Sequence, residues 1–355
     1  MAVSCIRQVK LDHCFIVCSC HIMFEPSVNF IFSFIFMIKV IQKNYAWAII
    51  LAVGIICASC NHRGESEEFC RKGYSELTSK QFKASLEDYN KAIAADSSYG
   101  MGWEGRGASE YYLDDYKNAI KDEFRAFTLD SNLKNVRNWI GNVKRELGDY
   151  KGSIEYYNRS IARGGENDLA RAYEGRGATE YYLNDYTKAM EDINKSISLD
   201  NTLEYANYWK GMIERSTGDY KASKEDFTQA IHKGAYTGKA FEWRASAEYH
   251  LNEYENALSD INRAILLDTT LNNANGIRAV IEQAMENYKS SVEDYTIAIK
   301  RADAENKTKD YEGLAIDEYY LKDYANALAY INLAVSDTTL RNAVAWKTAI
   351  EKAAK

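Results

Sequence analysis

The stretch Trp103–Ile120, WEGRGASEYYLDDYKNAI, decides how the rest of the sequence is interpreted, because three further copies of it follow. These are YEGRGATEYYLNDYTKAM from Tyr173, FEWRASAEYHLNEYENAL from Phe241 and YEGLAIDEYYLKDYANAL from Tyr311, at intervals of 70, 68 and 70 residues. A second, related phrase lies between the copies, for example GDYKGSIEYYNRSI, so the basic unit has 34 residues. Repetition at this period is typical of stacked supersecondary units. The eight units begin at Ser66, Gly100, Lys134, Ala170, Glu204, Gly238, Asn272 and Thr308.

Each unit has the pattern of two amphipathic helices that cross closely. Apolar residues in each half-unit follow the spacing i, i+3, i+4, i+7. Unit position 8 is always Gly or Ala, and position 20 alternates between Ser in odd units and Ala in even units. Two helices approach closely only where neither carries bulk, so these positions mark the crossing. Position 17 is always aromatic, from Phe82 to Tyr324, and we expect it to fill the space between helices.

This unit resembles the tetratricopeptide repeat (TPR) over residues 66–341. The resemblance implies an all-α fold, a right-handed α-solenoid of eight helix–turn–helix units, with residues 342–355 as a C-terminal capping helix. It also implies that the first helix of each unit, helix A, lines a concave face that receives extended peptides or partner helices. The family's usual proline at position 32 is missing from every unit. We therefore expect helix B to end through turn or N-cap residues, namely Asp130 with Ser131, Asp200 with Asn201 and Asp268 with Thr269.

Composition supports a helical solenoid and argues against a nucleic-acid partner. The 355 residues include one proline, where average usage would give roughly 18, and 27 tyrosines. No Pro/Gly/Ser-rich segment divides the chain. The net charge is −7, whereas proteins that bind nucleic acid carry an excess of Lys and Arg to neutralise phosphates.

The N-terminal region has the layout of an export signal. From Met37 the sequence MIKVIQKNYAWAIILAVGIICASC places two lysines before a short apolar run and small residues before Cys60. The ending resembles a bacterial lipobox, in which the cysteine is lipidated and becomes the mature N-terminus. Residues 37–59 are then a lipoprotein signal peptide and residues 60–65 a short tether, and residues 1–36 are an over-extended gene start or leader. Cys57 departs from the lipobox, where leucine is usual at that place.

An uncleaved membrane anchor is the alternative, although the apolar run is shorter than the roughly 20 residues that a spanning helix needs.

Six of the seven cysteines lie in the first sixty residues, so only Cys70 falls within the repeats. The spacing of Cys14, Cys18 and Cys20 is not that of a zinc site. We therefore expect neither a metal nor a cofactor.

Positions 7 and 23 vary together across the eight units. Where position 7 is Lys or Arg, position 23 is Asp, and in the other two units the pairs are Ile140 with Tyr156 and Leu314 with Tyr330. Paired variation indicates contact between helices A and B, and repetition in six places favours a structural role over acid–base catalysis. Glu stands at position 11 in these six units, so the basic side chain is expected to serve two carboxylates. The expected ion pairs are Lys72–Asp88, Arg106–Asp122, Arg176–Asp192, Lys210–Asp226, Arg244–Asp260 and Arg278–Asp294.

The face of helix A supplies the candidate ligand-binding residues, at positions 2, 5, 9, 12 and 13. Even units carry Glu at position 5 and Tyr or His at position 13, and tyrosine suits recognition because it offers a large amphipathic surface. We expect the tyrosines at position 12 to pack between units instead. The family's clamp for chaperone C-termini needs Lys at position 5, which no unit has. The candidates are Glu104, Tyr112, Glu174, Tyr182, Glu242, His250, Glu312 and Tyr320, with Asn138 and Tyr208 from odd units.

The sequence contains no catalytic motif such as HExxH, GxSxG or a P-loop. We therefore expect a non-enzymatic scaffold or adaptor, which binds a protein or extended peptide in a concave groove lined by helix A. The N-terminal lipid would hold it in the bacterial cell envelope, in the outer membrane rather than the inner. A glycan-binding lipoprotein that uses the groove tyrosines is the main alternative, and a hydrolase with an undetected site is a second. The oligomeric state is left open.

Overall fold

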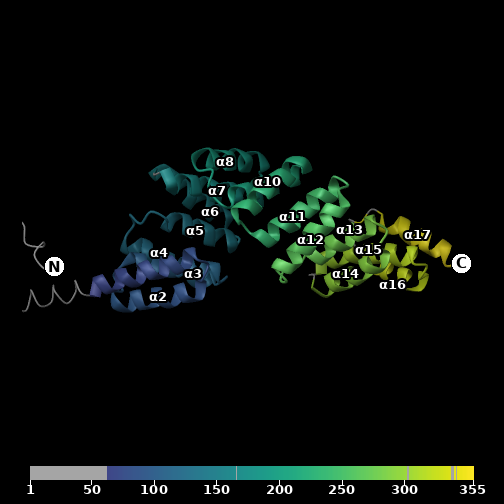
Figure 1. Ribbon diagram of the computed structural model, residues 1–355, viewed down its shortest axis with the longest axis horizontal. Coiled ribbons are helices and arrows are strands. Elements are labelled where there is room, and N and C mark those ends of the chain that lie inside the picture. Colours follow the sequence, from purple (N-terminus) through teal and green to yellow (C-terminus); the bar gives the residue numbers. More distant parts are fainter. Residues whose placement is uncertain (1–61, 165, 302–303, 337–339, 341) are drawn as a thin grey trace, which may run out of the picture. The chain divides into compact units, whose positions relative to one another are not determined.

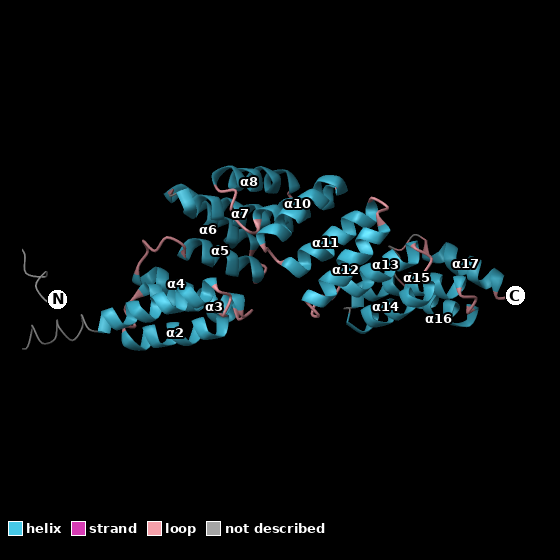
Figure 2. Ribbon diagram, viewed as in Figure 1, coloured by secondary structure: helices cyan, strands magenta, loops and turns pink. Residues whose placement is uncertain are grey.

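The protein is seen here in a computed structural model that describes residues 62–164, 166–301, 304–336, 340 and 342–355. All regular structure in these residues is helical, and none of them lies in a strand (Figure 2). Residues 65–355 form one compact unit. The expected all-α architecture is therefore confirmed. The predicted signal peptide and Cys60 lie outside the described residues.

Helices A and B alternate along the chain, two per repeat (Figure 1). Helix A of the first unit covers residues 62–78. The other A helices are α3 (Gly100–Tyr112), α5 (Val136–Glu146), α7 (Glu166–Tyr182), α9 (Ala206–Thr217), α11 (Thr237–His250), α13 (Ala274–Ala284) and α15 (Ala304–Tyr320). The B helices are α2 (Phe82–Ala95), α4 (Tyr116–Leu129), α6 (Tyr150–Arg163), α8 (Tyr186–Leu199), α10 (Tyr220–Lys233), α12 (Tyr254–Leu267), α14 (Tyr288–Arg301) and α16 (Tyr324–Ala334).

The first helix corrects one expected boundary. Residues 62–65, which we expected to be a tether, are already helical. The two units of 36 residues precede α7 and α15, which have 17 residues each, whereas α3 has 13. The extra residues therefore lengthen helix A.

The turn from helix A to helix B has one backbone conformation in all eight units. Position 15 lies in the left-handed region, with φ between 60° and 66° at six non-glycine residues and 79° and 88° at Gly148 and Gly218. Helix B then begins at the aromatic residue of position 17. In five units an Asp at position 16 accepts a hydrogen bond from the backbone N–H three residues later, which satisfies one free donor of the helix. These residues are Asp115, Asp149, Asp185, Asp219 and Asp323.

Helix B ends without proline in two ways. Asp130, Asp200 and Asp268 are C-cap residues, and the side chain of each accepts a hydrogen bond from the backbone N–H two residues later, at 2.8–2.9 Å. They form turns after helix B, as expected, and are not N-caps of the next helix. The B helices of units 3 and 5 instead end at Gly164 and Gly234, both with positive φ.

The crossing of helices A and B lies at positions 8 and 20. In odd units the serine of position 20 donates a hydrogen bond to the backbone carbonyl of position 8, for example from Ser153 to Gly141 at 2.8 Å. A Cβ at Gly177 would lie 3.0 Å from the backbone oxygen of Ala189. Position 24 fills the adjacent core and is buried in every unit, from Tyr89 to Ile331.

The last helix, α17 (Ala343–Ala353), occupies the place of a ninth helix A. Its Trp346 packs against Tyr319 and Tyr320, with ring centroids 5.7 and 6.2 Å apart. Trp139 in α5 packs against Tyr111 and Tyr112 in the same way. The helix therefore covers the end of unit 8, as expected for a cap.

Candidate functional site on the helix A face

The A helices of consecutive units contact one another from α3 to α17. Among the described helices, the B helices of consecutive units make no such contacts. The A helices therefore form a continuous surface along the repeats, which we call the A face. All the candidate ligand-binding residues belong to helices of this face.

The glutamates at position 5 are less exposed than a row of surface charges would be. Glu242 is buried, with 3% of its surface exposed, and Glu104, Glu174 and Glu312 are half-buried. Burial raises the pKa of Glu174 and Glu242 to about 7, and it raises that of Glu312. The negative charge expected on the A face is therefore partly lost at neutral pH.

The candidates from odd units are also less accessible than expected. Asn138 and Tyr208 are buried, with 5% and 6% of their surfaces exposed. The Tyr208 ring contacts those of Trp209, Phe227 and Tyr236. Neighbouring side chains therefore cover both candidates in this structure, and one of those that cover Tyr208 is Tyr236.

The aromatic side chains at position 13 each stack on the first residue of the preceding helix B. Tyr182 lies parallel to Tyr150 with ring centroids 5.6 Å apart, and His250 stacks on Tyr220 at 4.2 Å. The other two stacked pairs are Phe82 with Tyr112 and Tyr288 with Tyr320, both at 4.7 Å. Tyr182 and Tyr320 nevertheless remain 44% and 48% exposed, so they both connect units and present surface.

The tyrosines at position 12 pack between units, which confirms their expected role. Tyr181 contacts Trp209 of the next unit at 5.8 Å and Tyr186 of its own unit at 5.7 Å. The prediction for position 17 is only partly correct. These rings are half-buried and bridge to position 12 or 13, and the fully enclosed side chain of helix B is that of position 24.

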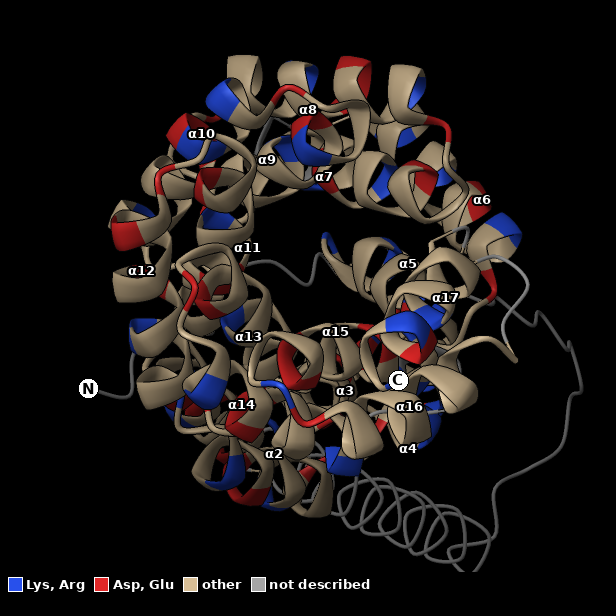
Figure 3. Ribbon diagram, turned by 90° about the vertical axis from the view of Figure 1, so that its right-hand side faces the viewer, with Lys and Arg blue, Asp and Glu red and all other residues tan. Residues whose placement is uncertain are grey.

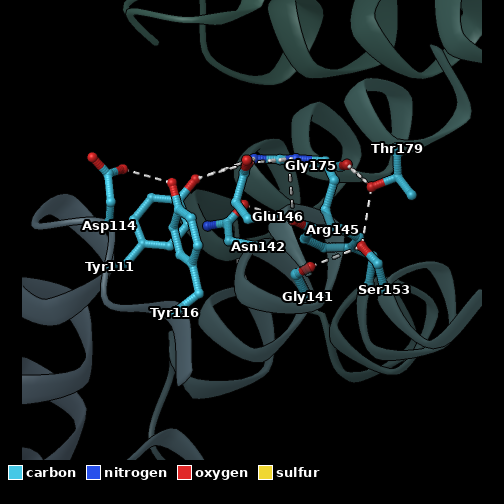
Figure 4. Close-up of polar contacts among 11 residues, drawn as sticks. Tyr111, Asp114, Tyr116, Gly141, Asn142, Arg145, Glu146, Ser153, Gly175 and Thr179 are labelled. Carbon is cyan, nitrogen blue, oxygen red and sulfur yellow. Dashed lines mark hydrogen bonds and ion pairs between the residues drawn. The ribbon is translucent and has the colours of Figure 1, made fainter. Parts of the chain in front are cut away.

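A polar network surrounds Arg145 at the C-terminal end of α5 (Figure 4). The buried guanidinium donates to Glu146 at 3.0 and 3.2 Å, and to the Tyr111 hydroxyl at 3.3 Å. The Tyr157 hydroxyl, 3.5 Å from Arg145, donates to Asn142 at 2.6 Å. The network joins units 2 and 3 and places a cation beneath the A face.

All six pairs of positions 7 and 23 lie in direct contact, with N···O distances of 2.5–2.7 Å. Each arginine binds its aspartate through two nitrogens, for example Arg176 to Asp192 at 2.6 and 2.8 Å. A side-chain oxygen of the preceding helix B takes a further N–H, as Asn158 does for Arg176 at 2.6 Å. In units 3 and 8, Ile140 and Leu314 are buried and pack near Tyr156 and Tyr330.

The glutamates at position 11 do not share these cations equally. In all six units the Oε2 atom is buried without a hydrogen-bond partner. Burial, together with the nearby aspartate, raises the pKa of Glu110, Glu180, Glu248 and Glu282 to about 7 and that of Glu214 to about 8. The basic side chain serves two carboxylates, as expected, in units 1, 2 and 5, where it lies 3.4–4.0 Å from the glutamate. The aspartate, at 2.5–2.7 Å, takes most of the interaction in all six units.

Acidic and basic residues are interspersed around the helices in the view of Figure 3. Among the described residues, no group of three or more His, Cys, Asp or Glu side chains could hold a metal ion. No helix in the described part of the chain combines the length and apolar character that crossing a membrane requires.

Comparison with known families identifies the repeat. Family models described as tetratricopeptide repeat match residues 135–163, 170–203 and 208–274. The fold is a TPR solenoid. The small glutamine-rich tetratricopeptide repeat-containing protein 2 of Saccharomyces cerevisiae is 23% identical to this chain over 141 residues, which are 40% of this chain and 38% of the yeast protein. The TPR repeat-containing protein MJ1428 of Methanocaldococcus jannaschii is 23% identical over 139 residues, 38% of this chain and 24% of the archaeal protein. The chain therefore spans well under half the length of either relative.

Solved TPR structures share the fold at low identity. The human IFIT1 dimer with m7Gppp-AAAA superposes with a TM-score of 0.61 and 13% identity, covering 81% of this chain and 72% of IFIT1. A chain of the APC/C hetero-tetramer Cut9–Hcn1 gives 0.58 and 13%, covering 72% of this TPR chain and 53% of the other. These likenesses establish the arrangement of helices alone. What this chain binds depends on its own side chains.

One aromatic residue at the A face, Tyr236, was not predicted from the sequence. Tyr236 lies in the loop between α10 and α11, and its ring contacts Tyr205 and Tyr208 at 4.5 and 5.0 Å. A helical repeat pattern carries no signal for a loop side chain. The sequence sign was that position 33 is Ser, Asn or Thr at four of the six other junctions, namely Ser98, Asn132, Thr202 and Thr270.

Proposed function

We propose that this protein is a non-enzymatic TPR adaptor that binds a partner protein or extended peptide along the A face. In this proposal Cys60 carries a lipid that holds the protein in the bacterial cell envelope, in the outer membrane rather than the inner. The net charge of −7 argues against nucleic acid as the partner.

The observation that carries the proposal is the continuity of the A face. The contacts of successive A helices extend from α3 to α17, so a ligand can touch side chains of several units at once. Exposed aromatic surface remains along it, at Tyr182 and Tyr320. Large rings with few torsions contribute contact area at low entropic cost, which favours binding of a protein segment.

Photo-crosslinking in cells tests partner binding. A photoreactive amino acid replaces Tyr182 in one strain and Lys151, an exposed residue of α6, in a control strain. A specific crosslinked protein at residue 182 that is absent at residue 151 supports the proposal, and Glu174→Lys should reduce it. Equal crosslinking from both positions would contradict a binding surface on the A face.

The glycan alternative uses the same exposed tyrosines. One face of Tyr182 is already covered by Tyr150, so a sugar could use only the rest of the ring. Saturable binding on a glycan array that Tyr182→Ala abolishes, without any protein crosslink, would favour this alternative over the adaptor.

Lipid anchoring is tested through Cys60. Cys60→Ser should move the protein from the membrane fraction to the soluble fraction, and the mature wild-type protein should begin at a lipid-modified Cys60. Mass spectrometry that finds peptides of residues 1–36 in the mature protein would overturn the cleaved signal peptide and favour an uncleaved anchor.

A further inference from the structure

Tyr236 departs from the pattern of the junctions between units. At four other junctions the residue at position 33 is Ser, Asn or Thr, and its backbone N–H bonds to an Asp two residues earlier. Here the segment is Gly234, Ala235 and Tyr236, without that turn. Tyr236 has φ 39° and ψ 47°, a left-handed conformation that aromatic residues rarely adopt. The loop is thus held in an uncommon geometry that directs a tyrosine side chain.

The Tyr236 ring packs on the A face of unit 5. Its centroid lies 4.5 Å from that of Tyr205, with the rings tilted, and 5.0 Å from that of Tyr208 in the edge-to-face arrangement that aromatic pairs favour. The ammonium of Lys239 lies 5.6 Å from the ring centroid. Tyr236 nevertheless keeps 37% of its surface exposed, so the ring rests on the A face and is not enclosed by it.

Charged residues of units 3 and 4 affect the pKa of the Tyr236 hydroxyl. Burial raises the pKa of the Tyr236 hydroxyl, and the positive charge of Arg145 opposes that rise. Glu146 and Glu174 act in the direction of burial. The Arg145 guanidinium itself lies 5.7 Å from the ring centroid of Trp209, which contacts the Tyr208 ring at 5.4 Å, so this buried cation belongs to the same cluster as Tyr236. Ring contacts and a cation beside the same aromatic cluster are together features that recognise a tyrosine.

We propose that Tyr205, Tyr208 and Arg145 form a subsite for a tyrosine side chain of an extended partner segment, and that Tyr236 occupies this subsite until the partner displaces it. We call these three residues the tyrosine subsite. The proposal rests on the proposed function, because it names the chemistry of the partner. The positive φ of Gly234, 80°, gives the loop a glycine at which it can turn the side chain away.

Displacement has a measurable consequence. A tethered side chain competes at an effective concentration in the millimolar range, so a free tyrosine must overcome it. Removing the tethered ring should therefore raise the apparent affinity of the tyrosine subsite by about tenfold or more.

The first experiment offers N-acetyl-L-tyrosinamide to the full-length protein and to Tyr236→Ala, with binding followed by saturation-transfer NMR. We expect saturable binding to the variant at least about tenfold tighter than to the wild type. Adding Tyr205→Ala should abolish the gain, and N-acetyl-L-phenylalaninamide should bind more weakly. Tyr182→Ala is the matched control, since it also removes an exposed tyrosine of the A face. Equal affinity in wild type and Tyr236→Ala, or the same gain in Tyr182→Ala, would overturn the proposal.

A second measurement avoids any loss of the side chain. A single 3-fluorotyrosine at residue 236 reports the environment of the ring in an otherwise unaltered protein by ¹⁹F NMR. Titration with N-acetyl-L-tyrosinamide should shift intensity to a second, solvent-like resonance. One unmoved resonance up to the solubility limit of the amide would refute displacement. Neither experiment uses the natural partner, so a failed tyrosine subsite and a failed crosslink are separate results.

Discussion

The junction between units 3 and 4 and the junction between units 5 and 6 differ in the two side chains that fill the space between the units. In the first, the Tyr157 ring lies over Gly175, where an added Cβ would overlap the ring. In the second, Phe227 lacks the hydroxyl and Trp243 stands in place of the glycine. Junctions 1–2 and 7–8 follow the first arrangement, with Tyr89 over Gly105 and Tyr295 over Gly313. Equivalent positions in different repeats are thus free to change, provided that the total volume is kept.

The largest expected effect comes from breaking the first arrangement. Gly175→Val should lower the free energy of unfolding by about 3 kcal/mol, because the new side chain overlaps Tyr157. Gly64→Val, where nothing lies within 4 Å of an added Cβ, is the control and should be nearly neutral. Denaturant unfolding measures both. Tyr157→Ala combined with Gly175→Val should cost less than the sum of the two single changes, and strict additivity would contradict the shared space.

A second test compares the charged pair at positions 7 and 23 of unit 4 with the apolar pair at the same positions of unit 3. Arg176→Met leaves Asp192 without its cation, and we expect a loss of about 3 kcal/mol, the lower end for a buried pair, since Arg176 is partly exposed. Arg176→Met with Asp192→Tyr imitates the apolar pairing of unit 3 and should be much milder. Thermal or denaturant unfolding measures the loss of stability in both variants. Equal losses in the two variants would refute the pairing.

The third test uses pH to probe the position 11 glutamates of the six units that carry the ion pair of positions 7 and 23. Glu180 has a pKa raised from 4.5 to about 7, so the folded protein keeps a proton that the unfolded chain releases. Its contribution to stability is complete below pH about 4.5 and is lost as the pH rises through about 7. Five such glutamates should make the protein less stable at pH 8 than at pH 5.

Glu180→Gln supplies the control for the pH dependence. The amide imitates the protonated acid, so the variant should be more stable than the wild type at pH 8, by an amount of order 1 kcal/mol. At pH 5 the two proteins should be nearly alike. Unfolding midpoints across this range measure the effect, and stability that rises with pH in the wild type would contradict the assignment.

The smallest effect concerns the turn at position 15, which is glycine in units 3 and 5 and another residue in the other six. Lys322 adopts φ 66°, a conformation that glycine reaches without steric cost. Lys322→Gly should therefore change stability by only about 0.5–1 kcal/mol in the stabilising direction. Gly148→Lys is the reverse change and should destabilise by a similar amount, as chemical unfolding would show.

The eight repeats acted as an internal alignment, and most of the fold was therefore predictable. Small residues at positions 8 and 20 located the crossing of the helices, and paired changes at positions 7 and 23 identified side chains that lie in contact. The candidate ligand-binding residues were less predictable. Glu242, Asn138 and Tyr208 lie on the expected face but are buried, because burial depends on which side chains of neighbouring units cover a position.

The sequence by itself determined the repeat length, the alternation of helices A and B and the pairing of charges within each unit, because these depend on contacts between residues a fixed distance apart in the chain. Only the tertiary structure decided which groups meet across units. Arg145 and Tyr236 lie on different units and no repeat spacing relates them, but Arg145 contacts Trp209, Trp209 contacts Tyr208, and Tyr208 contacts Tyr236. Stacking of the units brings both into one aromatic cluster, since it places Trp209 of unit 5 against Arg145 of unit 3. Tyr236, a loop tyrosine that the repeat does not specify, thus became the most testable feature of the A face.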